Sequence, residues 1–295
     1  MNQLLKKLHG TGVALVTPFQ KDGSIDFKAY TKLIKHVLKG KCEYIVPLGT
    51  TGESSTLSRD ERKAVLNCAI EVANKKVPVV LGLGGNNTHE IIRAFDDYDF
   101  KNVDAILSVS PYYSKPTQQG IIQHYKAIDK ASPVPIILYN VPSRTGSNML
   151  AETTLTIAQE CKNVIAIKEA SGNVEQAMFI LKEKPNDFLV ISGDDALTLP
   201  LISCGAVGAI SVVANAYPQD FSEMIRQALK LNFTKAKKLH YDLLPLIPLL
   251  FAEGNPSGIK SVLKQLEICD DYVRLPQLQV SKVLAKKIND FIIHY

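Results

Sequence analysis

Short apolar runs alternate with helix-like segments along most of this chain, and this alternation restricts the possible fold more than any other feature. The runs that resemble buried strands lie at residues 11–19, 44–49, 78–82, 103–109, 135–140, 163–168, 188–193 and 208–213. Helical spacing recurs between them, at 26–38, 118–130, 151–161, 174–184 and 196–203. Further helices are predicted to begin at Thr88 and after Ser58, which has Glu61 in the capping-box position. The predicted fold class is therefore α/β, a (β/α)8 TIM barrel with a C-terminal helical extension.

From about residue 217 onward the sequence shows only helical spacing. Candidate helices lie at 221–231, 233–250, 257–266 and 280–292. Pro245 and Pro248 are expected to break or kink the second of these helices. We expect two regions: residues 1–225 form the barrel with the active site, and residues 226–295 form a C-terminal helical region that packs on the barrel. A structural or oligomeric role is expected for this second region.

The sixth apolar run ends in a lysine, Lys168. Successive side chains of a strand point to opposite faces, so Val164, Ala166 and Lys168 are expected on one face. If that face points into a barrel, the amine lies in a poorly hydrated place and loses its charge easily, because burial disfavours the ammonium form. A neutral lysine amine can form a Schiff base with a carbonyl compound. The alternative is a surface lysine just beyond a strand end.

Polar motifs occupy the predicted carboxyl ends of the strands, where barrels of this type form their active sites. Residues 49–54 combine glycines with hydroxyls that can hold a carboxylate, unless they are only a turn before a helix. Tyr139 can transfer protons and Arg144 can bind a carboxylate, unless they are a core tyrosine and a solvated arginine. Tyr112 and Tyr113 place two phenols in a loop, where simple aromatic packing is the alternative.

Composition argues against several classes of function. The net charge of +5 is modest for 295 residues and no long basic run occurs, so no nucleic-acid partner is predicted. Five dispersed cysteines form no CxxC pair and six histidines form no HExxH, which argues against disulfides and against a metal site. This cysteine usage fits a reduced, cytoplasmic location. No signal peptide and no membrane-spanning stretch is predicted, so no membrane association is expected.

Together the motifs resemble those of the dihydrodipicolinate synthase family. They are GTTGES at 49–54, PYY at 111–113, YNVPSRTG at 139–146, IKEASG at 167–172 and SGDD at 192–195. The resemblance covers residues 12–213 and continues more loosely into the C-terminal helices. GTTGES with the sixth-strand lysine marks only a wider superfamily of pyruvate lyases, which includes N-acetylneuraminate lyase. The octamer that contains Arg144 distinguishes the synthases within it.

The resemblance implies a lyase that condenses pyruvate with L-aspartate 4-semialdehyde to give 4-hydroxy-tetrahydrodipicolinate, in lysine and diaminopimelate biosynthesis. Lys168 matches the Schiff-base lysine of the family and Tyr139 matches its proton donor and acceptor. Thr50 and Tyr113 match the relay partners of this tyrosine, with Tyr113 reaching into the site of a neighbouring subunit. Members are commonly tetramers built from two tight dimers, so a homotetramer is expected.

The substrate contacts are also implied by the resemblance. Thr51 and the backbone at Ile210 match pyruvate contacts, and Gly193 matches a backbone contact. Arg144 matches the residue that holds the carboxylate of the second substrate. No cofactor and no metal is implied, because the lysine is itself the electron sink.

Lysine-sensitive members of the family bind lysine between subunits, and this pocket has a counterpart here. The candidate regulatory residues are Ser54, Ser55, Arg59, Arg62, Asn86, Glu90 and Tyr112. Arg59 and Arg62 replace histidines of the sensitive members. Arg62 adds a fixed positive charge near a ligand with two ammonium groups, so weak or absent inhibition is expected. The alternative is that Arg62 points into solvent and leaves the pocket intact.

Two other functions stay open on the sequence. One is another pyruvate lyase of the superfamily, which acts on a sugar acid in the manner of N-acetylneuraminate lyase. The other is a barrel without catalytic activity that serves as a binding or scaffold protein. The presence of Lys168, Tyr139 and Arg144 together argues against the second, since a relic should lose at least one of them.

Overall fold

The computed structural model describes residues 2–295 and contains the predicted barrel. Its parallel strands are β1 (Gly10–Ala14), β2 (Tyr44–Val46), β3 (Val80–Gly82), β4 (Ala105–Val109), β5 (Ile136–Asn140), β6 (Val164–Glu169), β7 (Leu189–Ser192) and β8 (Gly208–Ser211). The hydrogen-bonded order is β2-β1-β8-β7-β6-β5-β4-β3. A parallel bridge between Ile45 and Val79 joins β2 to β3 and nearly closes the sheet. The predicted (β/α)8 fold is confirmed.

Helices follow the strands and cover the outside of the barrel. They are α2 (Phe27–Lys39), α3 (Arg59–Ala73), α4 (Thr88–Ala94), α5 (Gln118–Ala131), α7 (Ala151–Glu160), α8 (Val174–Glu183), α9 (Thr198–Ser203) and α10 (Pro218–Leu229), with the single-turn α6 (Pro142–Thr145) after β5. The predicted capping box begins α3: Glu61 N donates to Ser58 Oγ at 3.2 Å and Ser58 N donates to Glu61 Oε2 at 2.8 Å. These two bonds satisfy amides that the first helical turn leaves free.

The interior of the barrel is closed at the amino-terminal ends of the strands. Helix α1 (Asn2–Lys7) and the turn after it place Leu5 and Leu8 against the inward side chains of the strands, such as Ala105 and Ile137. These residues are buried, so water is excluded from this end. The other end of the barrel is left for polar side chains, which is the end expected to carry an active site.

Strand β6 departs from the regular alternation that the sequence predicts. Ala166 belongs to the inner core with Ile165, whereas Val164 packs in the outer layer between the sheet and the helices. The cause is a register shift, because Ile136 and Ile137 of β5 pair with Val164 and Ala166 rather than with consecutive residues. The expectation that Val164 shares a face with Lys168 was therefore wrong.

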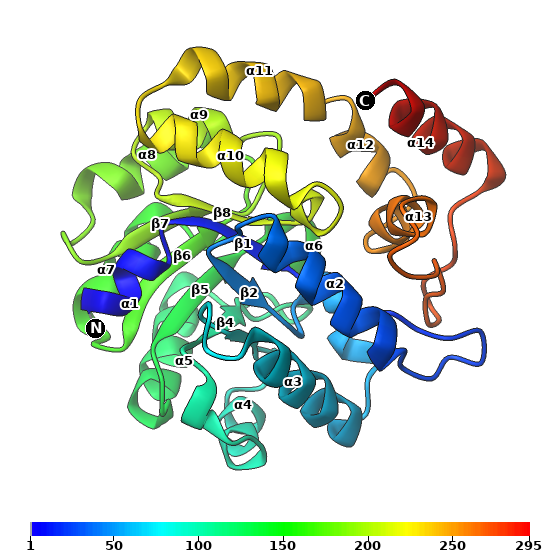
Figure 1. Ribbon diagram of the computed structural model, residues 1–295. Coiled ribbons are helices and arrows are strands. Elements are labelled where there is room, and N and C mark those ends of the chain that lie inside the picture. The colour runs from blue at the N-terminus through cyan, green and yellow to red at the C-terminus, as the bar shows by residue number, and fades with distance from the viewer. Residues whose placement is uncertain (1) are drawn as a thin grey trace.

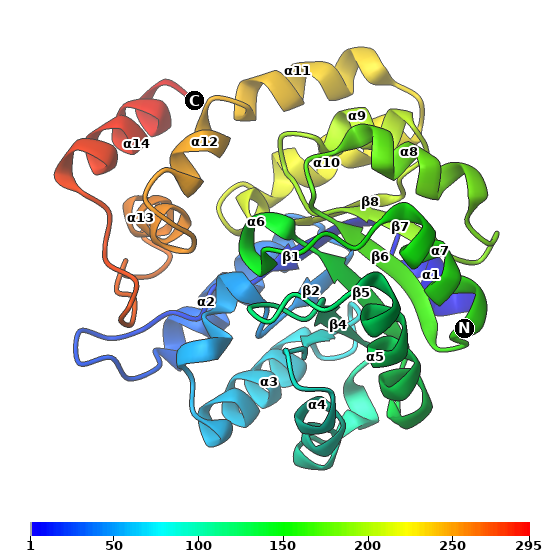
Figure 2. The same cartoon turned by 180° about the vertical axis from the view of Figure 1, so that it is seen from behind.

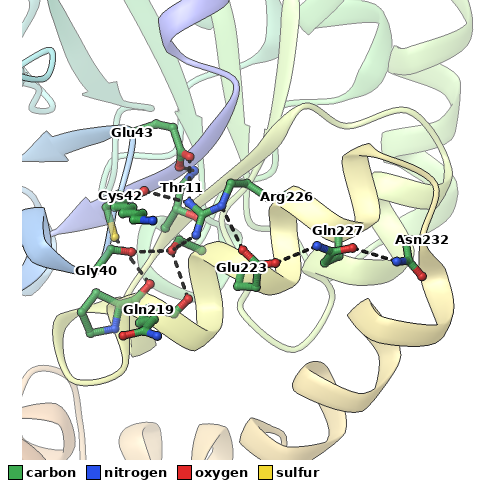
Figure 3. Close-up of polar contacts among 12 residues, drawn as sticks. Thr11, Gly40, Cys42, Glu43, Gln219, Glu223, Arg226, Gln227 and Asn232 are labelled. Carbon is green, nitrogen blue, oxygen red and sulfur yellow. Dashed lines mark hydrogen bonds and ion pairs between the residues drawn. The ribbon is translucent and has the colours of Figure 1, made fainter.

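Helix α10 fastens the outer layer to the start of β1 and β2. Arg226 Nη1 donates to Glu43 Oε1 at 3.1 Å, and Thr11 N donates to Glu43 Oε2 at 2.6 Å (Figure 3). Burial raises the pKa of Glu43, while the Thr11 amide and the Arg226 guanidinium oppose that shift. Arg226 thus compensates the charge of the half-buried Glu43 carboxylate and holds α10 against the starts of β1 and β2.

The C-terminal helices are α11 (Phe233–Leu243), α12 (Leu246–Phe251), α13 (Ser257–Gln265) and α14 (Lys282–His294). Figures 1 and 2, seen from opposite sides, both show α11 beside α10 and α12 to α14 together at one side of the barrel. Pro245 separates α11 from α12 as predicted, but Pro248 lies in the first turn of α12, where a missing amide costs no helical hydrogen bond. The division at residue 225 stays a prediction; helix α10 runs across it.

Candidate active site

A cavity of about 470 Å³ opens at the carboxyl ends of the strands. It collects side chains from motifs that lie far apart in the sequence. The predicted residues that line it are Thr50, Thr51, Ser54, Arg62, Tyr139, Arg144, Lys168 and Gly193. The structure therefore brings together four of the five motifs that carry the resemblance, in one cavity of the size of a small-molecule site. The exception is the PYY motif at 111–113.

Lys168 and Tyr139 face each other inside this cavity. They are directly paired residues of β6 and β5, and Lys168 Nζ lies over the tyrosine ring, 4.4 Å from its centroid. The Lys168 residue is only 5% exposed. Among residues 2–295, no carboxylate oxygen lies within 4.0 Å of Lys168 Nζ, so the amine is directed at the cavity and not at a counter-ion.

Gly193 keeps space open beside the lysine. A Cβ atom at this position would lie 3.0 Å from both Cε and Cγ of Lys168, and 2.6 Å from Cβ of Ala170. Real Cβ atoms rarely approach other atoms so closely, so any other residue would push the lysine stem aside. Glycine at the end of β7 is thus required by the packing of Lys168.

The threonines of the GTTGES motif are held by the C-terminal region. Thr50 and Thr51 lie in a short 3-10 helix, Thr50–Gly52, at the rim of the cavity. Asn255 Nδ2 donates to Thr51 Oγ1 at 2.9 Å, and both residues are buried. The hydroxyl orientation of Thr51 is therefore set by a residue more than two hundred positions away in the chain.

Glu53 of the same motif points away from the cavity and has a structural partner. It is buried in a left-handed conformation with φ of 53°, and Lys260 Nζ donates to Glu53 Oε1 at 2.5 Å. Arg274 N donates to Glu53 Oε2 at 3.1 Å. Burial lowers the pKa of Lys260, and the charge of Glu53 opposes that shift. Glu53 thus connects the C-terminal region to the rim of the cavity. It is not one of the groups of this motif that could bind the carboxylate of a substrate.

Arg144 projects from helix α6 at the mouth of the cavity. This single helical turn begins with Pro142 at its first position and ends at Gly146, whose φ is 69°. Such a conformation strains other residues, so the glycine fixes where the chain turns back. The arginine residue is exposed, and its guanidinium is free to meet an incoming substrate.

Two of the predicted catalytic and substrate-binding residues lie outside the cavity lining. Ile210 is buried in the inner core on β8, two positions before the cavity residue Val212. Tyr113 is 88% exposed, and its φ of 71° is uncommon for a residue with a side chain. In a single chain the phenol of Tyr113 therefore points to solvent rather than to Tyr139.

The candidate regulatory residues are only partly gathered at the cavity. Ser54 and Arg62 line it, whereas Ser55, Asn86 and Tyr112 do not. Arg59 forms an ion pair with Asp97, and Glu90 pairs with Arg93 at 3.3 Å. Burial raises the pKa of nearby Tyr98, and the positive charges of Arg62 and Arg59 oppose that shift. Arg62 is thus half-buried at the cavity wall and does not point freely into solvent.

Several lining residues were missed by the sequence analysis. Ile247, Pro248, Phe251 and Asn255 come from the C-terminal region, to which only a structural or oligomeric role was assigned. Asp195 also lines the cavity, and burial raises its pKa to about 6 although it accepts hydrogen bonds from Val212 N and Val213 N. The SGDD motif could have pointed to Asp195, whereas helical spacing gave no signal for Asn255.

Within residues 2–295, no group of three or more histidine, cysteine, aspartate or glutamate side chains is arranged to hold a metal ion. The helices of this part of the chain are all too short or too polar to span a bilayer.

Comparison with known proteins identifies the family. The model of the dihydrodipicolinate synthetase family matches residues 7–294. The chain belongs to this family. A 4-hydroxy-tetrahydrodipicolinate synthase of Flavobacterium psychrophilum is 50% identical to it over 282 residues, which cover 96% of each protein.

Solved structures of the dihydrodipicolinate synthetase family have the same fold. The crystal structure of dihydrodipicolinate synthase from Aquifex aeolicus gives a TM-score of 0.92 at 38% identity, with 98% of each chain covered. The enzyme from Cyanidioschyzon merolae with lysine bound gives a TM-score of 0.92 at 36% identity, covering 97% of this chain and 98% of that one. The family likeness therefore extends through the C-terminal helices, beyond the motifs of the barrel.

Proposed function

We propose that this protein is a 4-hydroxy-tetrahydrodipicolinate synthase, which condenses pyruvate with L-aspartate 4-semialdehyde. The observation that carries this proposal is the buried amine of Lys168 over the Tyr139 ring, in a cavity whose mouth holds Arg144. An amine, a phenol and a guanidinium supply the nucleophile, the proton carrier and the carboxylate anchor that this condensation needs. A non-catalytic scaffold has no need to bury an amine against a phenol.

The proposed reaction begins at Lys168. Its neutral amine attacks the keto carbon of pyruvate, water leaves, and an iminium forms. The iminium draws electrons from the methyl carbon, which loses a proton to give an enamine. The enamine carbon attacks the aldehyde of the second substrate and forms the new carbon–carbon bond. The amino group of that substrate then attacks the iminium carbon, closes the ring and displaces the lysine amine.

Proton transfers in this scheme are assigned to Tyr139, whose ring lies beside the Lys168 amine. Thr50, at the cavity rim, is proposed as its relay partner, and Tyr113 of a second subunit as the next member of the relay. A phenol serves such a role only when another group exchanges protons with it, because its own pKa is near 10 in water.

Substrate recognition is assigned to the remaining predicted residues. Thr51 and the backbone at Ile210 and Gly193 are proposed to hold pyruvate close to Lys168. Arg144 is proposed to bind the carboxylate of aspartate semialdehyde, since its planar fork matches a carboxylate. No cofactor or metal takes part in this scheme, because the iminium on Lys168 is the electron sink.

The direct test is turnover with both candidate substrate sets. Protein incubated with pyruvate and L-aspartate 4-semialdehyde is expected to consume both and to form 4-hydroxy-tetrahydrodipicolinate. The same protein incubated with N-acetylneuraminate is expected to release no pyruvate above background. Cleavage of the sugar acid, with no condensation, would favour the alternative lyase and contradict the proposal.

We propose that the working form is a cytoplasmic homotetramer built from two dimers, with Tyr113 shared across a dimer interface. Support comes from the large exposure of Tyr113 and of its neighbour Tyr112, on a loop whose backbone is strained at Tyr113 and Lys115. Exposed aromatic side chains on a fixed loop are typical of protein interfaces. Strained backbone of this kind is retained mainly at functional sites.

Subunit mixing tests the shared site. Tyr113→Phe and Lys168→Ala proteins, each expected to be nearly inactive alone, should regain activity when their subunits exchange, because some mixed sites contain both native residues. The measurement is turnover of the mixture before and after exchange, with exchange proven by mass spectrometry of a labelled partner. A mixture that stays inactive despite proven exchange would show that Tyr113 does not act across subunits.

Free lysine is expected to inhibit this protein weakly or not at all. Arg62 lies half-buried at the cavity wall, and only the resemblance places it beside a ligand with two ammonium groups. Two like charges about 4 Å apart repel by about 1 kcal/mol in water and by more in a drier cleft. A penalty of about 1 to 3 kcal/mol weakens binding roughly five- to more than a hundredfold.

The measurement for this prediction is the lysine concentration that halves turnover. Half-inhibition below millimolar concentration would contradict the expectation. Arg62→His should restore sensitivity. An Arg62→His protein that gains no sensitivity would overturn the electrostatic explanation.

A further inference from the structure

Behind the wall of the barrel, four polar side chains form a closed ring of hydrogen bonds. Asn140 Nδ2 donates to Asn148 Oδ1 at 2.9 Å and Asn148 Nδ2 donates to Gln176 Oε1 at 2.7 Å. Gln176 Nε2 donates to Glu169 Oε2 at 3.1 Å. Asn140 Nδ2 also donates to Glu169 Oε2 at 3.1 Å, which closes the circuit. We call these four residues the amide–carboxylate ring.

The ring lies directly behind the two central residues of the cavity. Asn140 follows Tyr139 at the end of β5, and Glu169 follows Lys168 at the end of β6. The register pairs Tyr139 with Lys168 and Asn140 with Glu169. Because side chains alternate along a strand, one pair faces the cavity while the other faces the outer helices. The other two ring members come from α8 and from the segment between α6 and α7.

The carboxylate of Glu169 is buried without a cation. Glu169 is 2% exposed, and within residues 2–295 no lysine, arginine or histidine nitrogen lies within 4.0 Å of its carboxylate oxygens. It accepts bonds from the amides of Asn140 and Gln176, and from Ser171 N at 2.6 Å. A buried carboxylate is costly unless donors surround it in a fixed arrangement. Within the ring Asn140 therefore donates to both of its neighbours, and Glu169 accepts from both of its neighbours. Because a carboxylate can only accept, it fixes which side chain donates in each bond.

We infer that the amide–carboxylate ring is a positioning device that holds Lys168 at reacting distance from Tyr139. This inference rests on the proposed function and adds positioning residues to it. None of the four ring residues lines the cavity, so the ring should act on the chemical step more than on binding. A shift of about 1 Å between reacting groups can cost about a hundredfold in rate.

Glu169→Gln is the first variant, because it keeps the shape of the side chain and places an amide where two amides already donate. The rate of borohydride trapping with pyruvate and the value of kcat are expected to fall together by about 10- to 100-fold. The KM values for both substrates are expected to stay within about threefold. A loss of thermal stability without a loss of trapping rate would mean that the ring is only structural.

The double variant Asn140→Asp with Glu169→Gln gives the sharper test. In this variant residue 140 becomes the acceptor and residue 169 the donor. The side-chain amides of Asn148 and Gln176 can then rotate by 180°, so that each bond of the ring forms with donor and acceptor exchanged. Met149 N, which donates to Asn140 Oδ1 at 3.0 Å, keeps its acceptor. Asn140→Asp alone places two carboxylates side by side, and should be more damaging than Glu169→Gln alone or the double variant. Recovery of the trapping rate in the double variant is expected; recovery of Tm without the rate would overturn the inference.

Two further variants keep the test decisive. Asn148→Ala interrupts the ring at a half-buried position without touching the carboxylate, and should slow trapping by about threefold or more even if Glu169→Gln does not fold. Gln118→Leu is the matched control, because Gln118 bonds the backbone of Asn148 at 2.9 Å but lies outside the ring. Equal trapping rates in the wild type and Asn148→Ala, or an equal fall in Gln118→Leu, would contradict the inference.

The same experiment separates this inference from the proposed function. A wild-type protein that is trapped with pyruvate but does not consume aspartate semialdehyde would contradict the proposed function, while the trapping rates would still judge the ring. A wild-type protein that is not trapped at all would contradict both.

Discussion

Replacing Lys168 by alanine is expected to abolish trapping of pyruvate and to lower kcat by about a thousandfold or more. The reason is that Lys168 is the amine at the carboxyl end of β6 that lies over the Tyr139 ring in the cavity. Losses of this size follow when a covalent nucleophile is removed and only binding and polar groups remain. The measurement is borohydride reduction with pyruvate, followed by mass mapping of the modified peptide.

A second lysine, at the opposite end of the same strand, serves as the control. Lys162 is exposed and lies just before β6, at the end of the strand that is away from the cavity. Lys162→Ala should keep full labelling and nearly full turnover, because its amine is solvated and remote from the cavity. Full labelling of the Lys168→Ala protein, or labelling of another lysine in the wild type, would falsify the assignment.

The barrel could be predicted from the sequence because its information is local. Each strand is a short apolar run, and most of the barrel helices show their own spacing or cap, as Ser58 and Glu61 do for α3. The short helices α1 and α6 were not predicted. Motifs at strand ends then converge in a barrel whatever their separation in the chain. That geometric rule explains why Thr50, Tyr139 and Lys168 line one cavity in the structure.

What the sequence did not show depends on contacts between distant segments. Asn255 orients Thr51, and Lys260 neutralises Glu53, yet nothing in the periodicity of the C-terminal helices marks either residue. The register shift that moves Val164 to the outer layer is likewise decided by pairing with β5 and not by the residues of β6 alone. The propensity of a residue depends only on its neighbours in the sequence and does not include pairing with distant strands. Tertiary packing therefore overrides the expected pattern.

The amide–carboxylate ring illustrates the same limit from another side. Asn140 and Glu169 belong to recognised motifs, but Asn148 and Gln176 lie outside them and look like ordinary surface amides. Only the fold shows that their side chains complete a circuit around a buried carboxylate. Tyr113 is the opposite case, since its motif predicts a role that a single chain leaves exposed to solvent.

Replacing Arg144 by alanine is expected to raise the KM for aspartate semialdehyde by about 10- to 100-fold, while the KM for pyruvate changes by less than about threefold. Hydrogen bonds to a charged group are worth about 1.5 to 3 kcal/mol, which corresponds to such a loss. The difference between substrates arises because Arg144 projects from α6 at the cavity mouth, whereas the proposed pyruvate contacts lie around Lys168.

Steady-state kinetics with each substrate varied in turn measures this difference. Arg144→Lys should recover only part of the loss, because an ammonium cannot present the planar fork that binds both oxygens of a carboxylate. Ser143→Ala is the matched control. Ser143 precedes Arg144 and also lines the cavity, but its side chain carries no charge, so both KM values should stay near those of the wild type. Equal increases in KM for the two substrates in Arg144→Ala would contradict this role. They would mean that the guanidinium also binds pyruvate or maintains the shape of the cavity mouth. An unchanged KM for aspartate semialdehyde would mean that another group binds its carboxylate.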